Sequence, residues 1–252
     1  MNFIKMKKYL ILSLLCLCSF CVQAQTFHSI IMVNKEEPNR QVDRTADFNN
    51  MCTFFTKIAQ SLGYRNNMLR YSGQNFKATN ALQAIESLNV GLNDIVVFYY
   101  SGHGANWDDD EWPHMAFLDR QYGETTIYNK LREKFSNAKL ILCISDCCNM
   151  DSEGARREKR TYSGFDPALT KKLFTDFEGH RSYEISASIR GQYSYSNRQY
   201  GALFGIALRE AVSSALTGNT QPNWVYVLEK AKSLTLELTN QEQMPQFKMN
   251  RW

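Results

Sequence analysis

The chain has 252 residues, of which 44% are hydrophobic and 21% are charged, so it is long enough to bury the core of one α/β domain. The formal net charge is +4, and three of the lysines lie at the extreme N-terminus. The charge of about +1 that remains without them gives no electrostatic reason to expect a nucleic acid as partner.

Residues 1–24 have the pattern of a secretory signal peptide, with the lysines ahead of an apolar stretch over 9–22. Val22-Gln23-Ala24 resembles a small-residue cleavage site, and the stretch is too short for a membrane-spanning helix. We therefore expect export to the periplasm or the extracellular space, with no membrane span after signal removal. An uncleaved tail or anchor is the alternative.

The rest of the chain alternates strand and helix patterns, without repeats or a linker, which predicts one domain over 25–252. Such alternation implies right-handed βαβ crossovers and a three-layer α/β/α fold with a mainly parallel sheet of about six strands. In chain order we expect a strand at Phe27–Val33, a helix at Asp47–Leu62, a strand at Asn67–Tyr71, a helix at Thr79–Leu88, a strand at Asp94–Ser101, a long polar loop at 105–120, a helix at Thr126–Phe135, a strand at Lys139–Ser145, a second long loop at 150–165, a helix at Pro167–Phe177, a strand at Tyr183–Ala187, a tyrosine-rich loop at 189–200, and helices at Tyr200–Leu216 and Asn223–Thr239.

Two of these strands end in residues that carry chemistry. The fifth element closes at Gly102-His103-Gly104, and the strand at Lys139–Ser145 closes at Asp146-Cys147-Cys148. Ligands and catalytic groups gather at the carboxyl ends of parallel strands. A histidine and a cysteine there are the two parts of an activated thiol nucleophile, because an adjacent imidazolium favours the thiolate. A core thiol beside an ordinary polar histidine is the alternative.

The other cysteines of the mature chain, Cys52 and Cys143, lie in apolar contexts and are expected to be small core residues. No spacing of cysteines and histidines resembles a zinc site. We therefore expect no metal and no required cofactor.

The motifs at the two strand ends resemble those of a known family. Tyr100-Ser101-Gly102-His103-Gly104 and Asp146-Cys147-Cys148 resemble the motifs of caspase-like cysteine proteases (peptidase family C14), and most of all those of metacaspases and bacterial caspase-like proteins. Weaker similarities continue at 186–188, 191–192, 201–204 and 244–246. The resemblance implies a caspase-like fold and a secreted cysteine endopeptidase acting on peptides or proteins.

Carried over residue by residue, Cys148 matches the nucleophile and His103 the general base. The backbone amides of Gly104 and Cys148 would form the oxyanion hole, which stabilises the negative oxygen of the intermediate. Cys147 is the rival nucleophile, but the family motif places the active thiol two residues after the aspartate. Asn149-Met150-Asp151 stands where metacaspases usually have His-Ser-Gly.

Asp146 suggests which bond is cut. Animal caspases, which cleave after Asp, have a glutamine at its position, and the pocket arginine of their Ser-Trp-Arg segment is missing from Ser194-Tyr195-Ser196. A buried carboxylate would repel an Asp side chain and pair with Arg or Lys, so we expect cleavage after Arg or Lys. Asp43, or alternatively Asp47, would be a second pocket carboxylate, although an arginine in the pocket, such as the nearby Arg40, would reverse the argument.

Ser186 and Ser194 are expected beside the substrate by the same resemblance. The alternative to a pocket role is that Asp146 caps a turn.

Two charged runs have competing interpretations. The loop at 152–165 is either an ordinary surface loop or a self-cleavage site, with candidates Arg156, Arg157, Lys159 and Arg160. Asp108–Glu111 lacks the alternating ligand spacing of a calcium loop, so an exposed acidic turn is favoured over calcium activation.

A catalytically silent caspase-like domain that binds peptides or partner proteins is the alternative from another functional class. A protease with a different pocket, in the manner of gingipains or clostripain, would also favour basic residues. The sequence predicts no oligomeric state.

Overall fold

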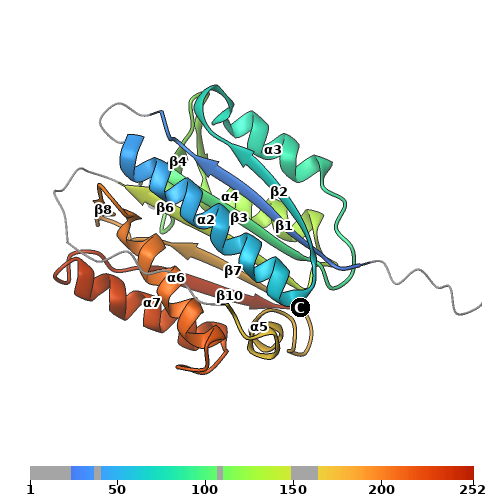
Figure 1. The fold of residues 1–252 in the computed structure, drawn as a ribbon. Coiled ribbons are helices and arrows are strands. Elements are labelled where there is room, and N and C mark those ends of the chain that lie inside the picture. The colour runs from blue at the N-terminus through green and yellow to red at the C-terminus, as the bar shows by residue number, and fades with distance from the viewer. Residues whose placement is uncertain (1–23, 37–40, 107–109, 149–163) are drawn as a thin grey trace, which may run out of the picture.

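The computed structural model describes residues 24–36, 41–106, 110–148 and 164–252, and it shows three layers with a sheet in the middle (Figure 1). The strand order is β10-β7-β6-β3-β1-β2, in which β10 is antiparallel to β7 and all other neighbours are parallel. The predicted fold class, a three-layer α/β/α fold with a mainly parallel sheet, is confirmed, and two short strands outside this path of six bring the sheet to eight strands.

The predicted helices and strands are present in the predicted order, with differences at several ends, but several short elements and the last strand, near the C-terminus, were not predicted. The strands are β1 (Thr26–Val33), β2 (Arg65–Tyr71), β3 (Ile95–Ala105), β4 (His114–Ala116), β5 (Gln121–Gly123), β6 (Leu140–Cys148), β7 (Arg181–Ser186), β8 (Ser196–Asn197), β9 (Gly201–Ala202) and β10 (Gln246–Arg251). The helices are α2 (Gln41–Leu62), the short 3-10 helix η1 (Gly73–Asn75), α3 (Ala78–Ser87), α4 (Glu124–Lys134), α5 (Pro167–Phe174), α6 (Leu203–Leu216) and α7 (Trp224–Leu238).

Successive residues of each central strand point to opposite sides of the sheet, and helices cover both faces. One face packs against α2, α5, α6 and α7 in a core that includes Tyr99 and Ile144 (Figure 1). The opposite face packs against α3 and α4 and includes Tyr100 and Cys143. Buried apolar strands with helices on both sides explain why these strands read as continuous hydrophobic runs.

Helix α2 begins at Gln41, six residues before the predicted start. The periodicity of apolar residues misses this first part because the side chains it buries are polar, namely Asp43, Arg44 and Asp47. The prediction that the helix begins at Asp47 was therefore wrong, and the consequence is that all three charged side chains are held on one rigid helix.

The predicted long loop at 105–120 is also wrong over much of its length. Strand β3 continues to Ala105, and β4 and β5 add an antiparallel ribbon to its end. These strands have three residues each and no apolar run, so they gave no strand pattern. In the tyrosine-rich segment, β8 pairs with β9 to form a second small ribbon.

Asp166 caps α5 as its position before a proline indicates, since its carboxylate accepts hydrogen bonds from the backbone N–H groups of Ala168 and Leu169. The helix ends at Phe174, three residues before the predicted end. Within the part of the chain that the structure describes, no helix is both long enough and apolar enough to cross a membrane.

Candidate active site

The register of the sheet brings position 103 beside position 148. In the parallel pair β3 and β6, Ser101 is the Cα partner of Asp146 and His103 is the Cα partner of Cys148. Neighbouring strands lie about 4.8 Å apart. His103 is exposed, and strand alternation places its side chain on the α2 side of the sheet, as for Tyr99 and Ser101. The two residues predicted to be catalytic therefore occupy adjacent backbone positions at the carboxyl edge of the sheet.

Cys147 faces the opposite side of the sheet, within the core formed by α3 and α4, and is only 2% exposed. Burial raises the pKa of its thiol well above the ordinary value, and the nearby charges of Glu124 and Asp146 raise it further. A Cβ atom on Gly104 would lie 2.5 Å from the Cβ of Cys147. The backbone of Gly104 thus rests directly on Cys147, which explains why position 104 has no side chain.

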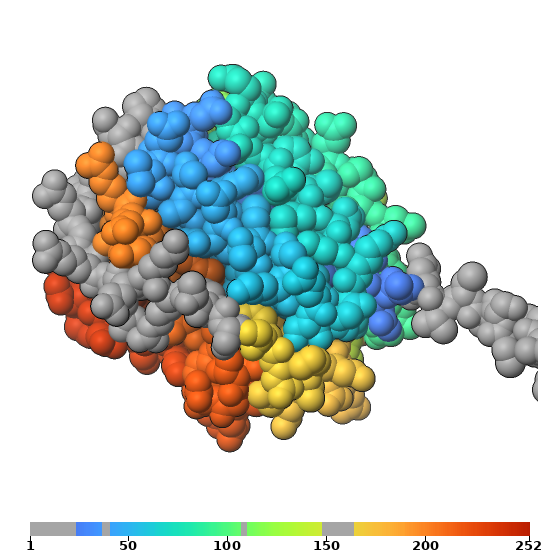
Figure 2. Space-filling view, in the orientation of Figure 1, coloured from blue at the N-terminus to red at the C-terminus, as the bar shows by residue number. Residues whose placement is uncertain are grey.

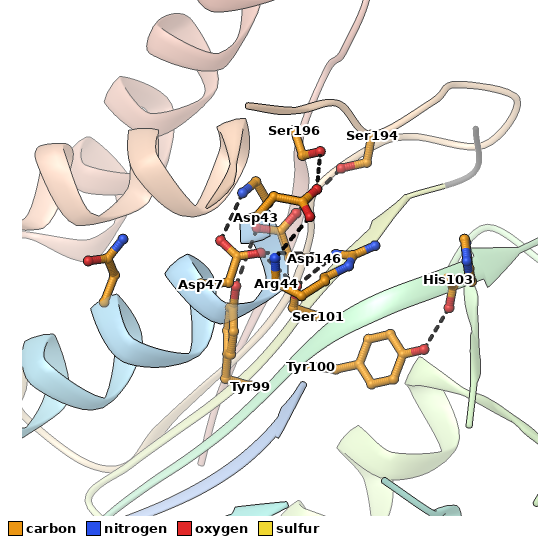
Figure 3. Close-up of polar contacts among 12 residues, drawn as sticks. Asp43, Arg44, Asp47, Tyr99, Tyr100, Ser101, His103, Asp146, Ser194 and Ser196 are labelled. Atoms are coloured by element: carbon orange, nitrogen blue, oxygen red, sulfur yellow. Dashed lines mark hydrogen bonds and ion pairs between the residues drawn. The ribbon is translucent and has the colours of Figure 1, made fainter. Parts of the chain in front are cut away.

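A buried cluster of charges lies on the α2 side of the site, and Figure 3 shows its central members. We call it the acidic cluster; it consists of three carboxylates and two guanidinium groups, none more than 4% exposed: Asp43, Arg44, Asp47, Asp146 and Arg209. It joins the start of α2, the end of β6 and the middle of α6. On the molecular surface, the segment around β8 and β9 (orange) lies against the start of α2 (blue), as Figure 2 shows.

Asp47 is held from two sides. Its carboxylate accepts hydrogen bonds from the Ser101 hydroxyl (2.9 Å) and from the backbone N–H of Ala202 (2.8 Å). The Ser101 oxygen in turn accepts from Nη1 of Arg44 at 2.9 Å, so the serine links this arginine to the carboxylate. Gly201 has φ +94°, and a Cβ there would collide with the Asp47 carboxylate, so only glycine fits.

The other two carboxylates are bonded to the segment before α6. The Ser196 hydroxyl donates to Asp43 at 2.8 Å, and the Ser194 hydroxyl makes a longer contact of 3.4 Å with Asp146 (Figure 3). Tyr99 donates to the other oxygen of Asp146 at 3.5 Å, which is also long. The side-chain hydrogen bonds to Asp146 from Ser194 and Tyr99 are therefore weak, which matters for its protonation.

Burial raises the pKa of Asp146 to about 7, and the neighbouring Asp47 carboxylate adds to the shift. Arg44, the backbone N–H of Gly205 and Arg209 oppose it. Burial also raises the pKa of Asp47, against the attraction of Arg44 and the hydrogen bonds from Ala202 and Ser101. The ionisation of the acidic cluster therefore changes within the physiological pH range.

The structure brings most of the predicted pocket residues together. Asp43 and Asp47, which the sequence left as alternatives, are both in the cluster with Asp146, and Ser194 contacts it. Ser186, at the end of β7, is also buried, and its hydroxyl donates to the carbonyl oxygen of Ser188 at 3.1 Å.

Sequence reasoning missed Arg44, Ser101, Ser196 and Arg209. A signal for Arg44 existed, because Asp43-Arg44 and Asp47 have the spacing of one helix face, but the helix was predicted to begin only at Asp47. Several predictions fall outside the described residues: the signal peptide over 1–23, Arg40, Asp108 and Asp109, and the proposed cleavage positions Arg156, Arg157, Lys159 and Arg160.

Among the residues that the structure describes, no three His, Cys, Asp or Glu side chains come together in a way that could hold a metal ion. Cys52, Cys143 and Cys147 are free thiols. The described side chains offer acid–base and electrostatic chemistry.

The fold is similar to that of a known protein. A crystal structure of a structural-genomics target protein from Geobacter sulfurreducens has a TM-score of 0.53 and 16% sequence identity, and the match covers 89% of this chain and 93% of the other. This similarity concerns the fold. A search of curated proteins returned no match.

A family model for the caspase domain matches residues 30–251, which is nearly the whole described chain and includes both strand ends of the site. The chain therefore belongs to the caspase domain family of cysteine peptidases.

Proposed function

We propose that this protein is a cysteine endopeptidase in which His103 is the general base and Cys148 the nucleophile. The observation that carries the proposal is the register of β3 and β6, which makes the two residues Cα partners at the carboxyl edge of the sheet. The histidine would take the thiol proton and later give it to the leaving amine, while the sulfur attacks the peptide carbonyl. This chemistry requires no cofactor.

The surroundings of Cys147 support Cys148 as the attacking residue. The nucleophile must reach the substrate as a thiolate. Cys147 is buried on the opposite side of the sheet from Ser101, and its pKa is raised, so it is held as a neutral thiol. Its contact with the backbone of Gly104 gives it a packing role instead.

We further propose that cleavage follows Arg or Lys. The acidic cluster is separated from the His103 and Cys148 positions by one strand repeat, since Asp146 lies two residues before Cys148. Two arginines, Arg44 and Arg209, lie in the acidic cluster, and Arg40 lies outside the described residues. With every group ionised, three carboxylates face two guanidinium groups, which leaves one net negative charge for a basic substrate side chain.

The preference for basic substrates should therefore depend on pH. A proton on Asp146 would cancel the net charge of the acidic cluster, and its pKa is about 7. Turnover of basic substrates should therefore rise as pH increases through this value, more steeply than the reactivity of the thiol alone.

Export and self-processing are further parts of the proposal and rest on the sequence. Residues 1–24 have the signal-peptide pattern, and the loop at 152–165 presents arginines and lysine that match the proposed specificity. Both segments lie largely or wholly outside the described residues. Retention of an intact loop during prolonged activity would argue against processing.

The test uses the purified protein and two variants, Cys148→Ala and the matched control Cys147→Ala. Matched fluorogenic peptides ending in Arg, Lys or Asp are followed with and without calcium. The proposal requires turnover of Arg or Lys peptides that disappears in Cys148→Ala and persists in Cys147→Ala.

Turnover of the Asp peptide alone would support peptidase activity but contradict the proposed cleavage after Arg or Lys. An absence of any turnover, together with a Cys148 that does not react with a thiol alkylator, would instead favour a silent peptide-binding domain. A requirement for calcium would contradict the expectation that the reaction needs no metal.

A further inference from the structure

Tyr100 is a fully buried residue on the opposite side of β3 from the acidic cluster. Its ring packs against Phe76 and Phe117, with centroid separations of 5.4 and 5.0 Å. The hydroxyl lies 2.6 Å from the carbonyl oxygen of His103 (Figure 3) and 2.9 Å from that of Ala116. Its single proton is therefore shared between two carbonyls, and the shorter contact is with His103.

This contact fixes the plane of the peptide that joins His103 to Gly104. A trans peptide is planar, so its C=O and N–H point in opposite directions, and the described part of the chain has no cis peptide bonds. The carbonyl of His103 points toward the tyrosine, on the α3 and α4 side. The N–H of Gly104 consequently points away from the tyrosine hydroxyl.

We propose that Tyr100 is a positioning residue that orients the Gly104 amide for oxyanion stabilisation. The inference rests on the proposed function. When the Cys148 sulfur bonds to the substrate carbonyl carbon, the carbonyl π electrons move onto oxygen, and the Gly104 N–H would donate to that oxygen. Tyr100 keeps its proton throughout and does not contact the substrate.

The two glycines beside His103 explain why such a clamp is needed. A Cβ on Gly102 would lie 2.6 Å from the Tyr100 hydroxyl oxygen, so the glycine leaves room for the phenol to reach the next carbonyl. Gly104 is required by the approach of Cys147. Glycine on both sides gives the backbone conformational freedom that would misdirect the amide, and the hydroxyl removes it.

The test compares Tyr100→Phe, which keeps the ring and removes the hydroxyl, with Tyr128→Phe. Tyr128 is an apt control because it is 2% exposed in the same core and its hydroxyl is bonded to Ser182 at 2.7 Å. In the full-length protein, Tyr100→Phe should lower kcat by about 10- to 100-fold with KM nearly unchanged, since one aligned donor contributes at least that much. Tyr128→Phe should leave kcat unchanged.

Two further readouts separate positioning from general disruption. The affinity of a peptide aldehyde, whose tetrahedral adduct has an oxygen in the same place, should fall with kcat in Tyr100→Phe. The rate of Cys148 alkylation by iodoacetamide should not change, because that reaction forms no oxyanion. Gly102→Ala, which displaces the phenol, should reproduce the pattern.

Wild-type kcat and aldehyde affinity in Tyr100→Phe would overturn the inference, as would a parallel loss of alkylation rate. If the wild-type protein hydrolyses no peptide, the proposed function fails. The role of Tyr100 in orienting the Gly104 amide is then tested separately, by amide hydrogen exchange in the Cys148→Ala background. Faster exchange at Gly104 on adding Tyr100→Phe would then support the clamp, and unchanged exchange would refute it.

Discussion

Replacing Asp146 by Asn should make the protein more stable and more tolerant of alkaline pH, while it abolishes turnover of basic substrates. The folded protein keeps a proton on this carboxyl until about pH 7, whereas an unfolded chain releases it near pH 4. Between these values the unfolded state binds fewer protons, so stability falls as pH rises. Asparagine has the same shape and no charge to desolvate.

The magnitude follows from the shift of the Asp146 pKa from 3.8 to about 7. At about 1.4 kcal/mol for each pKa unit, the cost of ionising the buried carboxyl grows by about 2 to 3 kcal/mol between pH 5 and pH 8. For a chain of this size, that corresponds to a difference of roughly 5–10 °C in Tm.

The assay is thermal unfolding of the wild type and Asp146→Asn at pH 5 and pH 8. The gain in Tm of the variant should be distinctly larger at pH 8. Tyr128→Phe serves as the control because burial raises the pKa of this phenol above its ordinary value near 10, so it carries no charge at either pH. Equal gains of Asp146→Asn at the two pH values would refute the assigned titration, and retained turnover of Arg peptides would remove Asp146 from substrate recognition.

Three other substitutions test the scaffold of the domain. Asp94→Asn should cost about 1–3 kcal/mol at pH 7, because the carboxylate accepts from the Thr26 N–H at 2.7 Å and contacts buried His28 at 3.2 Å; its pKa is lowered by these bonds, so the difference from wild type in urea unfolding should shrink as the pH falls below about 4. Gly104→Ala should abolish turnover because its Cβ would meet Cys147, and adding Cys147→Gly should restore part of it in the same peptide assay; no rescue would contradict the packing argument. Asp166→Ala should cost about 1 kcal/mol by removing the cap of α5, measured by thermal unfolding, and an unchanged Tm would show that the cap is dispensable.

Much of the fold could be predicted because short stretches of the sequence contain the patterns that specify its strands and helices. The strands β3 and β6 are continuous apolar runs, and Asp166 with Pro167 gives a capped helix start in consecutive residues. The pairing of His103 with Cys148 was also accessible, since two parallel strands place their carboxyl ends at one edge.

Only part of the acidic cluster could be predicted from the sequence. Asp146 could be identified from its place beside the thiols, but the burial of Arg44 depends on a helix turn whose inward residues are charged, so hydrophobic periodicity gives no sign of it. The bond between Ser101 and Asp47 joins residues 54 positions apart, and only the three-dimensional packing reveals it. Tyr100 looked like one more apolar strand residue, because nothing local indicates where its hydroxyl points.

The hydrogen bonds of the acidic cluster also determine when the site can exist during synthesis. Asp43 and Ser196 are 153 residues apart, and Asp47 and Ala202 are 155 apart, so the first and last thirds of the chain must both be present and docked. A nascent or truncated chain that ends before Ala202 would contain His103 and Cys148 but would lack the arrangement around Asp47. On the proposed function, the preference for basic substrates would arise only after nearly the whole domain has folded.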